Sequence, residues 1–145
     1  MSTARPTAPR WSDISEGLEL PPFDLPLTAS VIVAGAIASR DFMPVHHDRA
    51  YANSQGAPDI FMNILTTNGY VARFITDWAG PEAMLEKISI RLGAPACPDD
   101  TMRFTGNVIR TERRGDQGVV EVSLQGVNKF GAHVTGTAVL TLPAG

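Results

Sequence analysis

The stretch PDIFMNILTTNGYVARFITDWAG, residues 58–80, decides the fold because it carries a long helical pattern. Apolar residues recur along it at helical spacing, at Ile60, Ile64, Val71, Ile75 and Trp78. Asp59 stands where an N-cap is expected, and Gly80 followed by Pro81 ends the pattern. Further apolar residues widen the stripe, so we expect a long helix that the rest of the chain largely encloses.

The residues after this helix are typical of an antiparallel sheet. Segments of high strand propensity, separated by turn residues, cover 84–92, 101–112, 118–128 and 131–143. The turns RRGDQG and NKFG predict hairpins between the last three segments. Before the helix, three prolines in LPPFDLPLT (20–28) indicate an extended edge segment. The apolar run ASVIVAGAIA (29–38) is predicted to be a buried strand.

These elements predict an α+β fold in which a curled antiparallel sheet wraps around one long buried helix. The chain has 145 residues, which suits a single domain, and we place that domain at 13–145. Residues 1–12 are rich in Ser, Thr, Ala, Pro and Arg, so we expect a flexible tail there.

The composition argues against several classes of partner and of site. Twelve Lys and Arg residues against fifteen Asp and Glu residues give a formal charge of -3, which argues against nucleic acid or an anionic membrane as a partner. Cys97 is the only cysteine, so no disulfide can form within the chain, and its setting PACPDD matches no metal or redox motif. The sequence shows no signal peptide or membrane-spanning run, and we expect a cytoplasmic protein.

The stretch RDFMPVHHD, residues 40–48, holds the candidate chemistry. Asp41 and His46 are two titratable groups that could share one water and move its protons at neutral pH. A lone histidine is more often a satisfied structural residue, so this spacing alone is a weak signal. The side chain of His47 must diverge from that of His46, which favours a surface or packing role for His47 and argues against a metal site here.

This stretch resembles the Asp-x4-His phrase, close to GDxNPxHxD, of the MaoC-like family of hotdog-fold hydratases. The phrases ISIRLGAPACPDDTMRFTGNV and VNKFGAHVTGTAVLTLP follow in the family's order, and the resemblance covers residues 20–143. Three stretches are most similar to small MaoC-like subunits of heteromeric hydratases that act on steroid side chains: RDF..VHHD, DIF.NILT..G and TDWAGP. The sequence departs from the wider family at Met43, where Asn is common, and at Phe61-Met62-Asn63, where His-Gly-Met is usual.

The resemblance implies a hotdog domain that hydrates a 2-enoyl-CoA thioester with a bulky steroid-type acyl group. Asp41 and His46 would be the catalytic residues, with no metal and no cofactor apart from the coenzyme A of the substrate. Free backbone N–H groups at Met62 and Asn63, at the start of the helix, would bind the thioester carbonyl. A residue among Thr66, Thr67, Asn68 and Tyr70 would orient Asp41.

Other interpretations stay open. The chain could be a hotdog acyl-CoA thioesterase, or a non-catalytic subunit that completes a partner's site. Arg110, Arg113 and Arg114 could bind the phosphates of coenzyme A, although a solvated hairpin turn explains them as well. A second MaoC-like chain, or a second copy of this one, is expected as the partner, because a single curled sheet leaves an edge and apolar surface uncovered.

Overall fold

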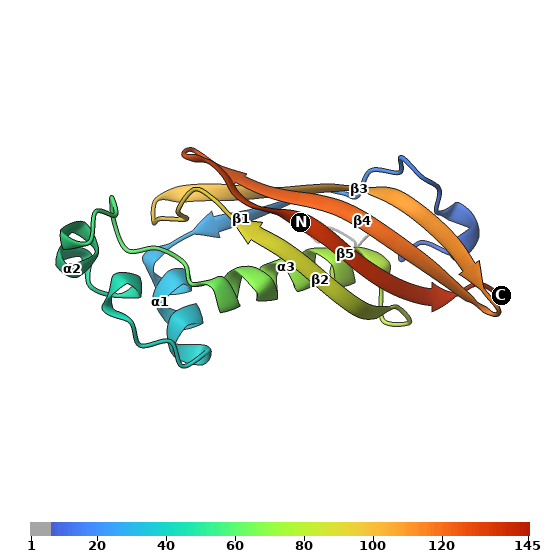
Figure 1. Cartoon of the computed structure of the whole chain (residues 1–145), viewed down its shortest axis with the longest axis horizontal. Helices are drawn as coiled ribbons and strands as arrows, with labels where there is room; N and C mark the ends of the chain where they lie inside the picture. The colour runs from blue at the N-terminus through green and yellow to red at the C-terminus, as the bar shows by residue number, and fades with distance from the viewer. Residues whose placement is uncertain (1–6) are drawn as a thin grey trace.

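The computed structural model describes residues 7–145 and confirms the predicted hotdog-type arrangement, a curled antiparallel sheet around one long helix (Figure 1). Neighbouring strands are antiparallel, in the order β1-β3-β4-β5-β2. The strands are β1 Phe23–Leu27, β2 Met84–Leu92, β3 Asp100–Arg114, β4 Gln117–Asn128 and β5 Gly131–Pro143. The long helix α3, Ile64–Ala79, lies against one face of this sheet.

The four strands predicted after the long helix are confirmed to within two residues at each end. The segment with three prolines contains β1, which is an edge strand and pairs only with β3 among the strands described. The two predicted hairpins join β3 to β4 and β4 to β5. The other edge of the sheet is β2, which pairs with β5 and leaves its second side unpaired in the described chain.

The core lies between the sheet and the inner face of α3. That face carries Thr67, Val71, Phe74, Ile75 and Ala79. Phe104 of β3 is fully buried, and its ring stacks on Phe23 of β1 and meets Phe74 of α3 at centroid distances of 5.8 and 5.9 Å. These rings therefore tie the edge strand, the sheet and the helix together.

The strand predicted for residues 29–38 is wrong, because this segment forms the helix α1, Ala29–Ala38. Thr28 is the N-cap, and its Oγ1 accepts a hydrogen bond from Val31 N at 3.0 Å. The cap and the four alanines favour the helix and offset its β-branched residues. Gly35 also allows α1 to approach α3 closely, since a Cβ atom there would lie 2.4 Å from Thr66 Oγ1.

The predicted start of the long helix is also wrong. Its N-cap is Asn63, whose Oδ1 accepts from Thr66 N at 3.1 Å. Asp59 instead binds the Arg49 side chain at 2.9 Å. Residues 60–62 stay extended because Met62 N donates to Ala96 O at 2.9 Å. The predicted end is confirmed, since Gly80 is the C-cap with a φ of 84°.

The N-terminal segment was expected to be flexible up to residue 12, and residues 1–6 of it lie outside the described residues. From Trp11 to Asp13 the chain forms the short 3-10 helix η1. Trp11 packs against the core and covers Gly118, where a Cβ atom would lie 2.1 Å from the indole. None of the helices in residues 7–145 is both long and apolar enough to span a membrane.

Candidate functional site

Asp41 is held at the C-terminal end of α1 by the backbone. Arg40 N donates to Ile37 O at 3.0 Å and Asp41 N donates to Ala36 O at 2.9 Å, which is the Schellman pattern of helix termination. This pattern places Arg40 in the left-handed region, with a φ of 57°, where glycine is usual. The Asp41 side chain therefore leaves the helix end at a defined angle.

His46 ends the 3-10 helix η2, Pro44–His46, and faces Asp41. Its Nε2 lies 3.2 Å from Asp41 Oδ2, and its Nδ1 lies 2.6 Å from the carbonyl oxygen of Phe61. The His46 side chain is 8% exposed and that of Asp41 is 29% exposed. Because both ring nitrogens face acceptors, the imidazolium form satisfies both contacts by donating from each.

The carboxylate of Asp41 accepts hydrogen bonds on both oxygens. Asn63 Nδ2 donates to Oδ2 at 3.1 Å, and Met43 N donates to Oδ1 at 3.3 Å. The Asn63 amide, more than any other group, holds the pKa of Asp41 below its usual value, with Met43 N and His46 adding to the effect against partial desolvation. Asp41 is thus an ionised carboxylate next to a histidine.

Asn63 donates to the Asp41 carboxylate, and none of the four helix residues predicted to orient Asp41 forms a hydrogen bond with it. Asn63 was predicted to act through its backbone N–H, and its side chain was missed. The available signal was its identity, because Asn before an apolar helical run is among the best N-caps. Recognising the cap would have moved the helix start to residue 64.

The backbone donors at this helix start differ from those predicted. Met62 N–H donates to Ala96 O, so the expectation that it is free for a substrate carbonyl is wrong. Asn63, Ile64 and Leu65 have N–H groups with no acceptor among residues 7–145, because the first turn of a helix has no carbonyl before it. The free donors therefore begin one residue later than predicted.

A small apolar groove of about 360 Å³ lies beside the Asp41–His46 pair, between α1 and α3. Ser39 links the groove to the pair. It lines the groove, and its Oγ accepts at 2.9 Å from Asn63 Nδ2, which also donates to Asp41. The groove is lined by Gly35 and Ala38 of α1, by the C-cap residue Ser39, and by Leu65, Thr66, Gly69, Tyr70 and Arg73 of α3. Small residues on both helices keep it open.

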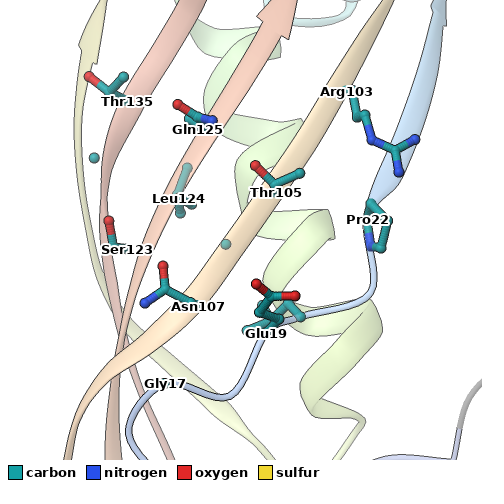
Figure 2. Close-up of a pocket in the computed structure, with 13 residues that line it drawn as sticks. Gly17, Glu19, Pro22, Arg103, Thr105, Asn107, Ser123, Leu124, Gln125 and Thr135 are labelled. Atoms are coloured by element: carbon teal, nitrogen blue, oxygen red, sulfur yellow. The ribbon is translucent and has the colours of Figure 1, made fainter.

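A larger hollow, about 790 Å³, lies elsewhere, on the face of the sheet that points away from α3 (Figure 2). Polar side chains from three strands line it, including Thr105, Asn107, Ser123, Gln125 and Thr135. It contains neither Asp41 nor His46, so its size does not make it the active site. Polar residues that alternate with core residues on a sheet are typical of a solvated face.

The arginines of the β3–β4 turn also lie far from the pair. Figure 1 shows this turn at the end of the sheet opposite to α1 and η2. Arg110 and Arg114 both contact Glu112, at 3.4 and 3.6 Å, and Arg113 binds the carbonyl oxygen of Gly145. These contacts favour the solvated hairpin over a site for coenzyme A phosphates.

His47, expected at the surface, is exposed and points to solvent in the turn before helix α2, Arg49–Ser54. Asp48 is the N-cap of α2, with Oδ1 accepting from Tyr51 N at 3.0 Å. His46, His47 and Asp48 therefore do not converge. No group of three His, Cys, Asp or Glu side chains within residues 7–145 is arranged to hold a metal ion.

His133 of β5 is a buried histidine outside the Asp41–His46 pair. The register jumps there from Gly126↔Val134 to Val127↔Ala132, so His133 is the extra residue of a β-bulge and turns inward. Its Nδ1 donates to Ala94 O at 2.7 Å, and its Nε2 accepts from the Thr67 hydroxyl of α3 at 2.8 Å. Burial lowers the pKa of His133 and keeps the ring neutral.

This burial predicts acid sensitivity. A histidine whose folded-state pKa is lowered stabilises the fold above the unfolded pKa, near 6.5, and that stabilisation is lost as the pH falls towards the folded value. We therefore expect the melting temperature to fall from pH 7 to pH 5, and this fall to be smaller in His133→Gln. Melting curves of both proteins at pH 7.5, 6.5 and 5.5 measure the difference. Equal slopes would assign the acid sensitivity to another group.

Comparison with known proteins adds to this geometry. A family model described as MaoC like domain matches residues 19–129. The 3-oxo-4,17-pregnadiene-20-carboxyl-CoA hydratase beta subunit of Mycobacterium tuberculosis is 44% identical over 126 residues, which are 87% of this chain and 95% of that protein.

Solved structures agree with this match. A chain in the crystal structure of the ChsH1-ChsH2 complex from Mycobacterium tuberculosis is 44% identical, with a TM-score of 0.83 over 88% of this chain and 98% of that one. The unliganded R-hydratase PhaJ1 from Pseudomonas aeruginosa has a TM-score of 0.81 over 94% of this chain and 86% of its own, at 18% identity. The second likeness concerns the fold alone.

Proposed function

The chain belongs to the MaoC-like domain family, as its sequence predicted, and we propose that it hydrates a 2-enoyl-CoA thioester at Asp41 and His46. The observation that carries this proposal is the contact of 3.2 Å between His46 Nε2 and Asp41 Oδ2. A carboxylate in contact with a histidine provides two groups that can move the protons of a single water molecule.

In the proposed reaction, Asp41 is the general base. Its carboxylate takes a proton from the water as the water oxygen bonds to C3 of the enoyl group. His46 supplies the proton that C2 gains, from Nε2, and the Asp41 proton can return to His46 across the short contact. The Phe61 carbonyl supports this role, because it accepts from Nδ1 and leaves Nε2 as the nitrogen that faces the reaction.

Addition of water to a conjugated thioester also places negative charge on the thioester oxygen. The free N–H groups of Asn63, Ile64 and Leu65 lie at the positive end of α3, and hydrogen bonds from such donors stabilise a developing oxyanion. We propose that this helix start, rather than Met62, binds the thioester carbonyl. The proposed reaction uses no metal and no cofactor beyond the coenzyme A of the substrate.

For the acyl group we propose a bulky, apolar ring system of the steroid type. The related beta subunit is named for a pregnadiene carboxyl-CoA substrate. In this chain the groove beside Asp41 is apolar, and its volume of about 360 Å³ falls in the usual range for ligand sites of about 300–1,000 Å³.

Gly69 offers a test of this substrate class. A Cβ atom at Gly69 would meet nothing within 4 Å, so a larger side chain there fills the groove without disturbing the helix. Gly69→Leu should lower kcat/KM for a polycyclic enoyl-CoA by roughly tenfold or more, and for a four-carbon enoyl-CoA by far less. Gly69→Ala is the matched control, because it adds one methyl group and favours the helix. Equal losses for both substrates would place the acyl group elsewhere.

The proposed reaction itself is tested with linear and steroidal 2-enoyl-CoA esters, by following the loss of enoyl absorbance. Free thiol is assayed in the same reactions, because a hotdog thioesterase would release coenzyme A. Loss of absorbance without thiol supports hydration, whereas thiol release with the enoyl group intact would identify a thioesterase. A non-catalytic subunit would give neither, and would leave a partner's activity unchanged when Asp41 is replaced.

We also propose that the chain works as a heteromer with a second MaoC-like chain. The related beta subunit is named as part of a hydratase, and the related crystal structure is of a two-protein complex. In this chain, β2 is an edge strand with Met84 and Leu92 exposed, and unpaired strand edges of this length are usually covered. A homodimer is the alternative when the chain is produced alone.

Light scattering measures this association directly. At micromolar concentration the 15.5 kDa chain is expected to form a particle of at least two chains, either with a co-produced MaoC-like protein or with itself. The hydratase activity should follow that particle through size-exclusion chromatography. A fully active 15.5 kDa monomer would contradict the proposal.

A further inference from the structure

The Asn63 side chain makes three hydrogen bonds at the junction of α1, α3 and Asp41. Its Oδ1 accepts from Thr66 N at 3.1 Å, and its Nδ2 donates to Ser39 Oγ at 2.9 Å and to Asp41 Oδ2 at 3.1 Å. Asn63 is only 2% exposed, so no water competes strongly for these contacts. Both N–H groups and the oxygen of the amide therefore have partners, and these three hydrogen bonds fix its orientation.

From this geometry we propose that Asn63 is a positioning residue of the hydratase site, which aligns the Asp41 carboxylate and keeps it ionised. This inference rests on the function proposed above for Asp41. An amide suits this position for a chemical reason, because it carries an oxygen that accepts from the helix start and a separate NH2 group that donates to both Ser39 and Asp41, whereas a hydroxyl has only one hydrogen to donate. Aspartate would cap the helix equally well but would present an acceptor to Asp41.

The other two donors to Asp41, Met43 N and His46, are less suited to hold its carboxylate in place. Met43 N is a longer contact, at 3.3 Å, and it reaches the other oxygen. His46 reaches the same oxygen at 3.2 Å, but it exchanges protons in the proposed reaction and cannot be a constant donor. The Asn63 amide does not titrate, so it is a permanent donor for the oxygen that faces His46.

Two variants separate positioning from folding. Asn63→Asp keeps the size and the cap, but it puts a second carboxylate beside Asp41, so the pKa of one of the two should rise strongly. The acid limb of kcat/KM should move towards neutral pH by more than about one unit, with kcat/KM at pH 6 reduced roughly tenfold or more. Asn63→Ser keeps a capping hydroxyl but is too short to reach Asp41, and it should lower kcat with a smaller shift of the acid limb.

The matched control is Thr28→Ala, which removes the N-cap of α1 and touches no group in the site. It should lower the melting temperature and leave the pH profile unchanged. The same shift of the acid limb in Thr28→Ala as in Asn63→Asp would reduce Asn63 to a structural cap and overturn the inference.

A measurement without substrate keeps the inference independent of the proposed reaction. Carboxyl ¹³C NMR should find the Asp41 pKa below its usual value in the wild-type chain and higher in Asn63→Ser. An unchanged Asp41 pKa in folded Asn63→Ser would overturn the inference even in an active enzyme. Conversely, a raised pKa in a chain without hydratase activity would support Asn63 as the positioning residue and would reject the proposed reaction.

Discussion

Asp41→Asn and His46→Gln are each expected to lower the hydratase kcat by about 10²- to 10⁴-fold while the fold persists. Each substitution removes a proton-transfer group and keeps nearly the same volume. His46→Gln retains a donor for the Phe61 carbonyl, and Asp41→Asn retains an oxygen that can accept from Asn63. The loss of rate therefore reports on proton transfer rather than on packing.

The double variant should be little worse than either single variant, because the two groups handle the protons of one water molecule and act as a unit. His47→Gln is the control, since the exposed His47 ring should change kcat by less than about tenfold. Enoyl absorbance gives the rates, and circular dichroism with thermal melting verifies the fold of each variant. If folded His47→Gln lost as much kcat as His46→Gln, the wrong histidine would have been identified. Full activity in both variants would contradict the proposed hydratase reaction.

Phe104→Ala is expected to have the largest effect on stability, about 3–5 kcal/mol of unfolding free energy. Phe104 is fully buried, and its ring contacts Phe23 of β1 and Phe74 of α3. Truncation leaves a cavity at the point where the edge strand, the sheet and the helix meet. Because domains of this size are stable by only about 5–15 kcal/mol, the variant should be close to unfolding at room temperature.

Phe130→Ala is the matched control for this prediction. The chemical change is the same, but Phe130 lies in the β4–β5 turn and is 45% exposed, so the cost should stay within about 1 kcal/mol. Urea unfolding of the wild-type chain and both variants measures the two costs. Similar costs at the two positions would mean that the rings around Phe104 close over the cavity.

The fold was predictable where a pattern repeats over many residues. The strands β2 and β5 start and end where predicted, since each lies between strong turn signals such as NKFG. The helix α1 was not predictable in the same way. Its run of aliphatic residues fits a buried strand or a buried helix equally well, and the Thr28 cap and the contact of Gly35 with α3 decide between them.

The site was predictable in part. The resemblance of RDFMPVHHD to the motif of the MaoC-like family singled out Asp41 and His46, whereas their spacing alone was a weak signal. In the structure, a helix end followed by a single 3-10 turn brings the two side chains into contact. The residue that orients Asp41 was predicted in the helix interior, whereas the side chain that donates to Asp41 is that of the N-cap Asn63. A cap is read from the sequence only when the helix start is known, and that start depends on contacts with other segments.

Local sequence thus determined the amphipathic period of the long helix, the strand alternation and the spacing of Asp41 from His46, because neighbouring side chains are related by covalent geometry. Tertiary structure decided between Asp59 and Asn63 as the N-cap of α3. Met62 N–H is taken by Ala96 O, so the segment before Asn63 stays extended. The Phe61 carbonyl then has no helical partner, and it accepts from His46 Nδ1 instead. A helix begun at Asp59 would have used that carbonyl for its own hydrogen bonds, because a backbone acceptor within a helix is already occupied.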